Sequence, residues 1–168
     1  MKRYILSLLS LTIALIGFNT SCTKVPVGYL NSEHASYSPN SIEVYRQIDL
    51  SGLSEKEQAE RLEVPQSSTA LQGLSGTAPI TYSFHSVKVS EGGDEAAFLK
   101  TVQEGNLIVR GGYIQLRQRG ISQLPVGKYT ISIRVSNEGH EAILSDIFSF
   151  IVKEQPEEAE NTASSSNE

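Results

Sequence analysis

Alternation between apolar and polar residues, with a period of two, is the dominant pattern along this chain. It is clearest from Lys128 to Val135, where Tyr, Ile and Val occupy the odd-numbered positions and polar residues the even-numbered ones. Residues 41–50 repeat the pattern, with Arg46 as the one charged residue on the apolar side. Such alternation is typical of half-buried β-strands, so we expect a strand at each place.

Further strands follow from less regular stretches. The sequence NLIVRGGYIQLRQRG predicts two short strands on either side of Gly111 and Gly112. Residues 142–152 are apolar at successive positions near their end, so both faces of this last strand are expected to be covered. Across residues 80–89 the alternation changes phase, which predicts a bulge or a crossing between two sheets near His85.

Two segments depart from the β pattern. Ser54 and Glu57 have the spacing of a capping box, which predicts a short surface helix or a polar connection over residues 54–62. Residues 95–102 form a weak helical or irregular run. Elsewhere, short strands and turn residues follow one another at roughly even spacing. We therefore expect an all-β fold made of a single antiparallel β-sandwich.

The first residues have the organisation of a secretory signal peptide. Lys2 and Arg3 precede an apolar run, Ile5 to Phe18, which is shorter than the roughly 20 residues of a membrane-spanning helix. Small and polar residues then lead to Cys22, the only cysteine of the chain. We therefore expect residues 1–21 to be removed during export.

Two fates are open for Cys22 after export. Ser21 and Cys22 resemble the lipobox of bacterial lipoproteins, in which cleavage before the cysteine precedes its lipidation. Asn19 departs from the leucine usual three residues before that cysteine. Plain signal-peptide cleavage would instead leave a free thiol, which is a liability in an oxidising compartment. Lipidation is therefore the favoured interpretation, and several acyl chains would hold the protein to a bilayer.

Composition divides the mature chain into three parts. Residues 22–40 predict a lipidated tether and edge segment, residues 41–153 contain the strands of the sandwich, and residues 154–168 have the composition of a disordered tail. The net charge of −5 and pI near 5.3 argue against binding to nucleic acid or to an anionic membrane surface. The chain has no Trp, so a carbohydrate platform would rest on tyrosines.

The segment from Ala78 to Val152 resembles a cadherin-like or Ig-like module. The motifs that carry the resemblance are GTAPITYSF, EGNLIV, LPVGKYTISIRVSNEG and DIFSFIV. In this interpretation Gly127 makes a turn and Tyr129 packs at the end of the sandwich. The next apolar positions of that strand fill the core, namely Ile131, Ile133 and Val135. The resemblance predicts the fold and says almost nothing about function, because this fold hosts many tasks.

The segment CTKVPVGYLNSEHASYSPNSIEV is similar to the start of a family of uncharacterised Bacteroidetes-type lipoproteins. That start has a lipidated cysteine followed by a K-x-P-x-G-Y-L stretch, here Lys24 to Leu30, with Asn31 where a serine is frequent. The resemblance implies an outer-membrane lipoprotein associated with glycan-uptake systems of the starch-utilisation type. It implies as partners the bilayer, through Cys22, and a glycan or the uptake complex. It implies no particular binding residue.

The side of the membrane that the protein faces is suggested by residues 23–28. Acidic residues soon after the lipidated cysteine are a frequent surface-export signal in such bacteria. This stretch has none, and Lys24 is basic. A periplasm-facing orientation is therefore favoured over a surface-exposed one.

One candidate ligand surface lies in the stretch VRGGYIQLRQRG. Strict alternation predicts that its aromatic, amide and guanidinium groups share a strand face opposite Ile114 and Leu116. A guanidinium beside an aromatic ring suits sugar hydroxyls or carboxylates. The alternative is that these are ordinary solvent-facing residues, with arginines protecting a sheet edge from aggregation. The candidate residues are Tyr113, Gln115, Arg117 and Arg119.

Metal and catalytic motifs are not found in the sequence. His34, His85 and His140 lack zinc-ligand spacing, and no D-x-D run suggests calcium. There is also no G-x-S-x-G motif, so we expect no cofactor and no catalytic residue.

We expect a non-enzymatic accessory or ligand-binding lipoprotein of a glycan-uptake system. The alternatives are an envelope protein that binds a protein partner through a sheet edge and, third, an enzyme with titratable residues converging in one pocket.

Overall fold

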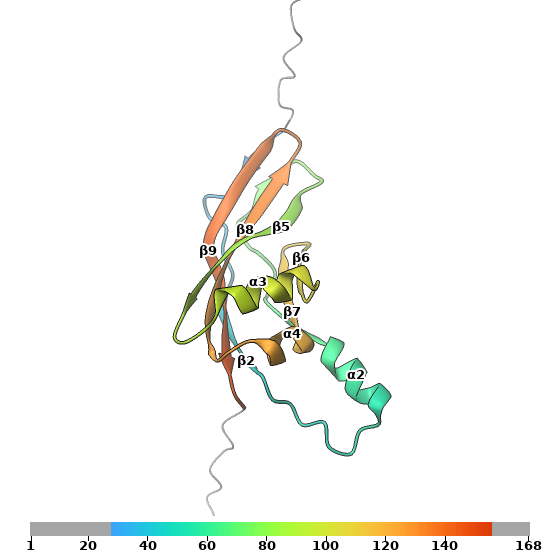
Figure 1. The fold of residues 1–168 in the computed structure, drawn as a ribbon. Coiled ribbons are helices and arrows are strands. Elements are labelled where there is room, and N and C mark those ends of the chain that lie inside the picture. Colours follow the sequence, from blue (N-terminus) through green and yellow to red (C-terminus); the bar gives the residue numbers. More distant parts are fainter. Residues whose placement is uncertain (1–27, 156–168) are drawn as a thin grey trace, which may run out of the picture.

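The computed structural model describes residues 28–155, which form mostly β-strands together with three helices (Figure 1). The expected signal peptide and Cys22 lie outside these residues. Of the expected tail, only Glu154 and Gln155 are described. No helix within the described range is long and apolar enough to cross a membrane.

A four-stranded sheet forms the larger layer of the fold, with the order β2-β9-β8-β5. Three of its strands are antiparallel neighbours, but β2 runs parallel to β9. The expectation of a purely antiparallel arrangement is therefore wrong at this edge. The two strands are about a hundred residues apart in sequence, so no hairpin sets their relative direction. The strands are β2 (Ser41–Tyr45), β5 (Thr81–Ser90), β8 (Gly127–Asn137) and β9 (His140–Lys153).

A three-stranded antiparallel sheet forms the second layer, with the order β3-β7-β6. Gly111 and Gly112 connect two of its strands with φ angles of 59° and 81°. A two-residue type I′ hairpin turn requires positive φ at both positions, which explains the glycine pair. The predicted strands on either side of the pair are confirmed. The bounds are β3 (Pro65–Ser67), β6 (Leu107–Arg110) and β7 (Tyr113–Arg117).

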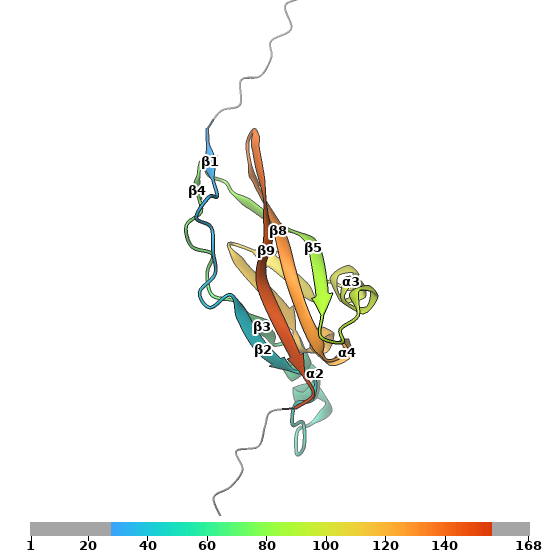
Figure 2. The same ribbon diagram turned by 90° about the vertical axis from the view of Figure 1, so that its left-hand side faces the viewer.

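A short ladder between β1 (Leu30–Asn31) and β4 (Ser75–Gly76) lies beside the β8–β9 hairpin (Figure 2). The Asn137 side-chain amide donates hydrogen bonds to the carbonyl oxygens of Tyr29 at 2.7 Å and Thr77 at 3.0 Å. These hydrogen bonds and the β1–β4 ladder attach residues before position 41 to the folded body.

Side chains from both sheets form one hydrophobic core. Tyr129 and the apolar residues that alternate after it on β8 are fully buried, as the period-two pattern predicts. Ile114 and Leu116 of β7 are also fully buried. On β9 the inward face is buried, whereas Ile147 and Ile151 on the other face are only half-buried. The expected covering of both faces of β9 is therefore partial.

The phase change near His85 is a β-bulge in β5. Phe84 pairs with Ile133 and Ser86 pairs with Ser132, so His85 is the extra residue. The bulge allows Phe84 and Val87 to point to the same core although they differ in parity. The predicted bulge is confirmed.

Two helices begin at residues whose side chains cap their first turn, and the first of these caps is the one that the sequence predicts. Ser54 caps α2 (Glu55–Glu63), with both halves of the capping box present, and none of its residues is buried. Asp94 caps α3 (Glu95–Gln103), whose Phe98 stacks on the Tyr129 ring with centroids 5.3 Å apart. The predicted surface helix is confirmed, and the weak run after Asp94 is a helix.

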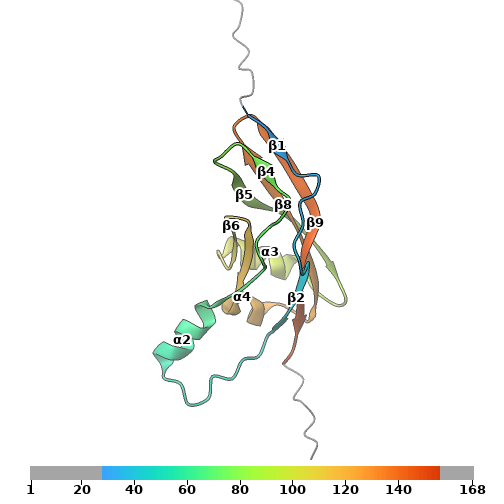
Figure 3. The same cartoon turned by 180° about the vertical axis from the view of Figure 1, so that it is seen from behind.

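A third helix replaces the end of an expected strand. The chain leaves β7 after Arg117 and forms α4 (Gln118–Gln123), seen beside α3 in Figure 3. The Gln118 N–H donates to the Val64 carbonyl, and Ile121 and Leu124, one turn apart, are fully buried. Because the buried pair has helical spacing, its burial favours a helix here. Arg119 therefore lies on a helix and does not follow the strand alternation assumed for it.

Tyr37 predicts a pH dependence of stability. Its hydroxyl donates to the Gly112 carbonyl at 3.1 Å. Burial is the main cause that raises the pKa of Tyr37 to about 12. An unfolded tyrosine titrates near pH 10, so this contribution is complete below pH 10 and is lost as the pH rises toward 12. Phenylalanine has no hydroxyl to titrate. Between pH 10 and 12 we therefore expect the free energy of unfolding of Tyr37→Phe, measured with urea, to fall less than that of the wild type. Parallel pH profiles of the two proteins would contradict this.

Candidate functional site

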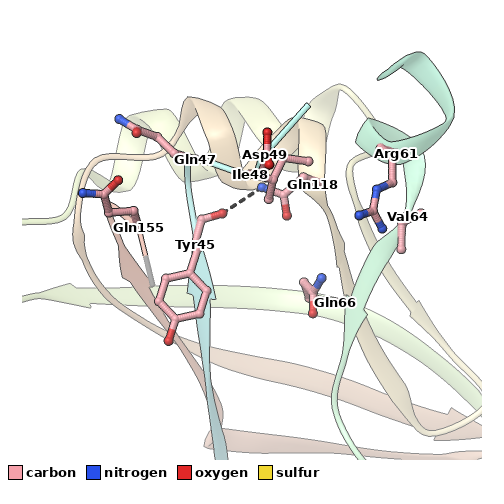
Figure 4. Close-up of a pocket in the computed structure, with 9 residues that line it drawn as sticks. All are labelled: Tyr45, Gln47, Ile48, Asp49, Arg61, Val64, Gln66, Gln118 and Gln155. Carbon is pink, nitrogen blue, oxygen red and sulfur yellow. Dashed lines mark hydrogen bonds between the residues drawn. The ribbon is translucent and has the colours of Figure 1, made fainter. Parts of the chain in front are cut away.

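A pocket of about 550 Å³ lies near the C-terminal end of β9, where segments from both halves of the chain meet (Figure 4). Its walls come from the end of β2 and the connection after it, the end of α2, β3, α4 and the residues after β9. Its volume falls in the range of about 300–1,000 Å³ typical of small-molecule sites. The lining residues are Tyr45, Gln47, Ile48, Asp49, Arg61, Val64, Gln66, Gln118 and Gln155.

Gln118 is the most constrained polar side chain of the pocket, with only 3% of its surface exposed. Its Nε2 donates to the Tyr45 carbonyl at 2.7 Å and lies 3.5 Å from the Ser122 hydroxyl. A carbonyl oxygen can only accept, so this bond fixes which end of the amide faces Tyr45. The Gln118 carbonyl oxygen then points into the space between Tyr45 and Gln66 (Figure 4).

The wall formed by residues 46–47 is fastened to its neighbours. The Ser122 hydroxyl donates to the Arg46 carbonyl at 2.9 Å. Backbone N–H groups of Arg46 and Gln47 donate to Lys153 and Glu154, each at 2.9 Å. The Glu154 carboxylate also accepts from the Gln47 amide at 2.7 Å and pairs with Arg46 at 2.6 Å. These bonds hold the connection after β2 against α4 and the end of β9.

The pocket lining carries balanced charge. Asp49 is its only acidic and Arg61 its only basic side chain. Hydrogen bonds from the Ser51 hydroxyl and then from the Ser51 N–H lower the pKa of Asp49, so it is a carboxylate at neutral pH. No ion pair found among residues 28–155 uses Arg61. The remaining polar lining consists of four amides and a phenol.

The candidate surface from the sequence analysis lies elsewhere. Tyr113, Gln115 and Arg117 share the outward face of β7, as alternation predicts, but Arg119 lies on α4. The Glu63 carboxylate pairs with Arg117 at 3.4 Å and with Arg119 at 2.7 Å.

The four candidates therefore do not form one cationic and aromatic surface. The two guanidinium groups are partly neutralised by the shared carboxylate, at one end of β7, while Tyr113 is 43% exposed at the other end. The Gln115 amide lies 3.4 Å from the Ser67 hydroxyl of β3. None of the four lines the pocket.

The sequence reasoning missed the pocket because its residues come from separate segments. One local signal was present: Arg46 interrupts the apolar side of its strand, and the structure shows that β2 ends one residue earlier. The residues that follow form the pocket wall rather than continuing the sheet.

The part of the chain from residue 28 to 155 has no group of three or more His, Cys, Asp or Glu side chains placed to hold a metal ion. Comparison with known proteins gives no match to any family model, curated protein or solved structure.

Proposed function

We propose that this chain is a membrane-anchored, non-enzymatic ligand-binding or accessory lipoprotein of a bacterial cell-envelope glycan-uptake system. The lipid is carried by Cys22 and the membrane is the outer membrane, with the protein facing the periplasm. The observation that carries the binding role is the pocket around Gln118, with its fixed amide and balanced charge. The lipobox-like Ser21–Cys22 pair and the family resemblance support the location and the glycan context.

The fold that we propose is an Ig-like or cadherin-like β-sandwich. Strands β3-β7-β6 and β5-β8-β9 have the order of the B-E-D and C-F-G strands of such domains. The β2 strand adds to the second sheet beside β9. The Tyr129 hydroxyl donates to the Pro125 carbonyl four residues upstream at 2.8 Å, as in the tyrosine corner of these domains.

The position of the pocket supports a role away from the bilayer. The described chain starts at Gly28, beside the β8–β9 turn, whereas the pocket lies at the other end of β9 (Figure 1). The 14 residues of β9 correspond to roughly 45 Å of strand. Cys22 is six residues from Gly28, a distance of at most about 20 Å. A lipid on Cys22 would therefore hold the hairpin end near the membrane and direct the pocket outward.

The single carboxylate of the pocket supports binding over acid–base catalysis. Its one carboxylate, Asp49, has a lowered pKa, and a strongly ionised carboxylate is a weak acid–base catalyst at neutral pH. The tyrosines with raised pKa values, Tyr37 and Tyr129, lie in the core rather than in the pocket.

The proposal is tested with the full mature lipoprotein in detergent. We expect calorimetry against a panel of polysaccharides to show binding of at least one glycan without hydrolysis. We also expect a pull-down from membranes to return an outer-membrane uptake complex. Protease treatment of intact cells should leave the protein uncut. The absence of both glycan binding and the uptake complex would contradict the proposed function.

The second candidate function is a structural or adhesive role through a sheet edge. The observation in its favour is β5, a ten-residue outer strand of the four-stranded sheet. Charged side chains protect outer strands from pairing, and β5 has only one, Lys88, which lies 3.8 Å from the Asp146 carboxylate. Outer strands offer unpaired backbone groups to a partner. This function predicts that a pull-down returns the same protein partner with or without glycan.

A further inference from the structure

We propose that the pocket around Gln118 is a binding site for a neutral, hydroxyl-rich ligand, namely one end of an uncharged oligosaccharide. This inference deepens the proposed function and rests on it for the biological source of the ligand. The chemistry of the ligand follows from the pocket itself. The candidate residues on β7 are not part of this site.

Gln118 provides a hydrogen-bond acceptor that is fixed before the ligand arrives. The side chain is buried, and each of its side-chain hydrogen bonds uses the nitrogen. Its carbonyl oxygen points into the pocket (Figure 4). This oxygen is not one of the buried polar atoms that lack a partner, so it is open to the pocket and can accept a hydrogen bond from an occupant that brings a donor. Because the nitrogen is already held by Tyr45, binding requires little further ordering of the amide.

The other amides of the pocket match hydroxyl groups. Gln66 and Gln155 each offer two N–H donors and one carbonyl acceptor. Gln47 uses its nitrogen on Glu154, which leaves its carbonyl oxygen as an acceptor. A sugar hydroxyl both donates and accepts, so an amide group can satisfy it in either sense. A simple cation or anion would use only half of this capacity.

The charges of the pocket favour a neutral ligand. Asp49 accepts from Ser51 at Oδ1, which leaves Oδ2 available to a donor. Arg61 brings a guanidinium from the end of α2 (Figure 4). One positive and one negative side chain give the lining no net charge, and Glu154 beside Gln47 is paired with Arg46, so the two charges nearest the lining also balance. Both charged groups are suited to hydrogen bonds with hydroxyls.

Apolar surface in the pocket suits the C–H faces of a sugar ring. The Tyr45 ring lines one side, and Val64, which is 47% exposed, lies on the other side beside Arg61 (Figure 4). Small-molecule sites combine apolar walls with a few oriented polar groups. An aromatic ring with a polar tip is well adapted to such a mixed surface.

The test measures the affinity of the full mature lipoprotein in detergent for neutral oligosaccharides of glucose, mannose and xylose. Polygalacturonate is the anionic probe, and a glutamine-rich peptide is a second neutral probe. The pocket variants are Gln66→Ala and Arg61→Ala, alone and combined. The matched controls are Gln115→Ala and Arg119→Ala, which carry the same changes outside the pocket. We expect the combined pocket variant to weaken binding of the best oligosaccharide by at least about tenfold and the controls to leave it unchanged.

A substitution at Gln118 adds a direct readout. We expect Gln118→Met to remove detectable binding, and the side-chain amide NMR signals of Gln118 in wild type to shift when the oligosaccharide is added. Should Gln118→Met fail to fold, the Gln66 and Arg61 variants and the wild-type NMR shifts still decide the matter, because those substitutions are at exposed positions.

The outcomes separate this inference from the proposed function. Glycan binding that survives the pocket variants, or that is lost in Gln115→Ala, overturns the pocket assignment and leaves the proposed function standing. Preferential binding of polygalacturonate or of the peptide overturns the neutral-sugar assignment. If no oligosaccharide binds but the uptake complex is recovered, the inference is wrong and the accessory role stands. If neither is found, the proposed function itself is wrong.

Discussion

Replacing Cys22 by Ser is expected to move the protein from the membrane fraction to the soluble fraction. Serine has no sulfur to carry a thioether-linked lipid. Each buried methylene of an acyl chain contributes about 0.8 kcal/mol, so two or more chains make membrane release negligible, and their loss removes this anchoring free energy. Cell fractionation with immunoblotting measures the redistribution, and mass spectrometry of the wild type measures the added acyl mass.

The control for this experiment is Thr20→Ser, which alters the export segment by one methyl group and keeps Cys22. It should remain in the membrane fraction with its acyl groups. A Cys22→Ser protein that stays in the membrane, together with an unmodified thiol in the wild type, would establish plain secretion instead. The proposed anchoring geometry would then be wrong, while the pocket at the opposite end of the molecule would be unaffected.

Local signals in the sequence predicted most of the strands and helix starts. Alternation around Tyr129 located the central strand because one of its faces is buried. The phase change at His85 located the bulge, since a single extra residue reverses the side-chain parity. Ser54 and Glu57 located the start of α2 because the capping box involves only neighbouring residues.

Features that depend on distant contacts were not predicted. The parallel pairing of β2 with β9 joins Ser41 to Ser149, and no local motif encodes it. The strand after Gly112 ends at Arg117 because the next residues bury Ile121 in the core.

The pocket also depends on contacts between residues that are distant in the sequence. The Gln118 amide is held in the pocket only because the chain brings Tyr45, 73 residues away, within hydrogen-bond distance. A glutamine in a linear sequence carries no sign of such a partner. The arginines at positions 117 and 119 stood out in the sequence, yet Glu63 pairs with both of them. The sequence therefore indicated the polar residues of this end of the molecule without indicating which of them face a common space.

Tyr129 is expected to be the side chain whose truncation destabilises the fold most among the tyrosines. Its hydroxyl donates to the Pro125 carbonyl at 2.8 Å and accepts from the Asp94 N–H at 3.2 Å. Its ring stacks on Phe98 of α3 at 5.3 Å. One fully buried side chain therefore joins the start of β8, the loop after α4 and the first turn of α3.

We expect Tyr129→Ala to lower the free energy of unfolding by about 3–5 kcal/mol, because it removes a large buried ring and leaves a cavity. Tyr129→Phe keeps the ring and should cost less, about 1–3 kcal/mol, since it leaves the Pro125 carbonyl and the Asp94 N–H without their partner. Urea unfolding followed by circular dichroism measures both. The matched control is Tyr113→Ala at an exposed position, with a change within about 0.5 kcal/mol. Equal losses for Tyr129→Ala and Tyr113→Ala would show that Tyr129 does not join these three elements energetically.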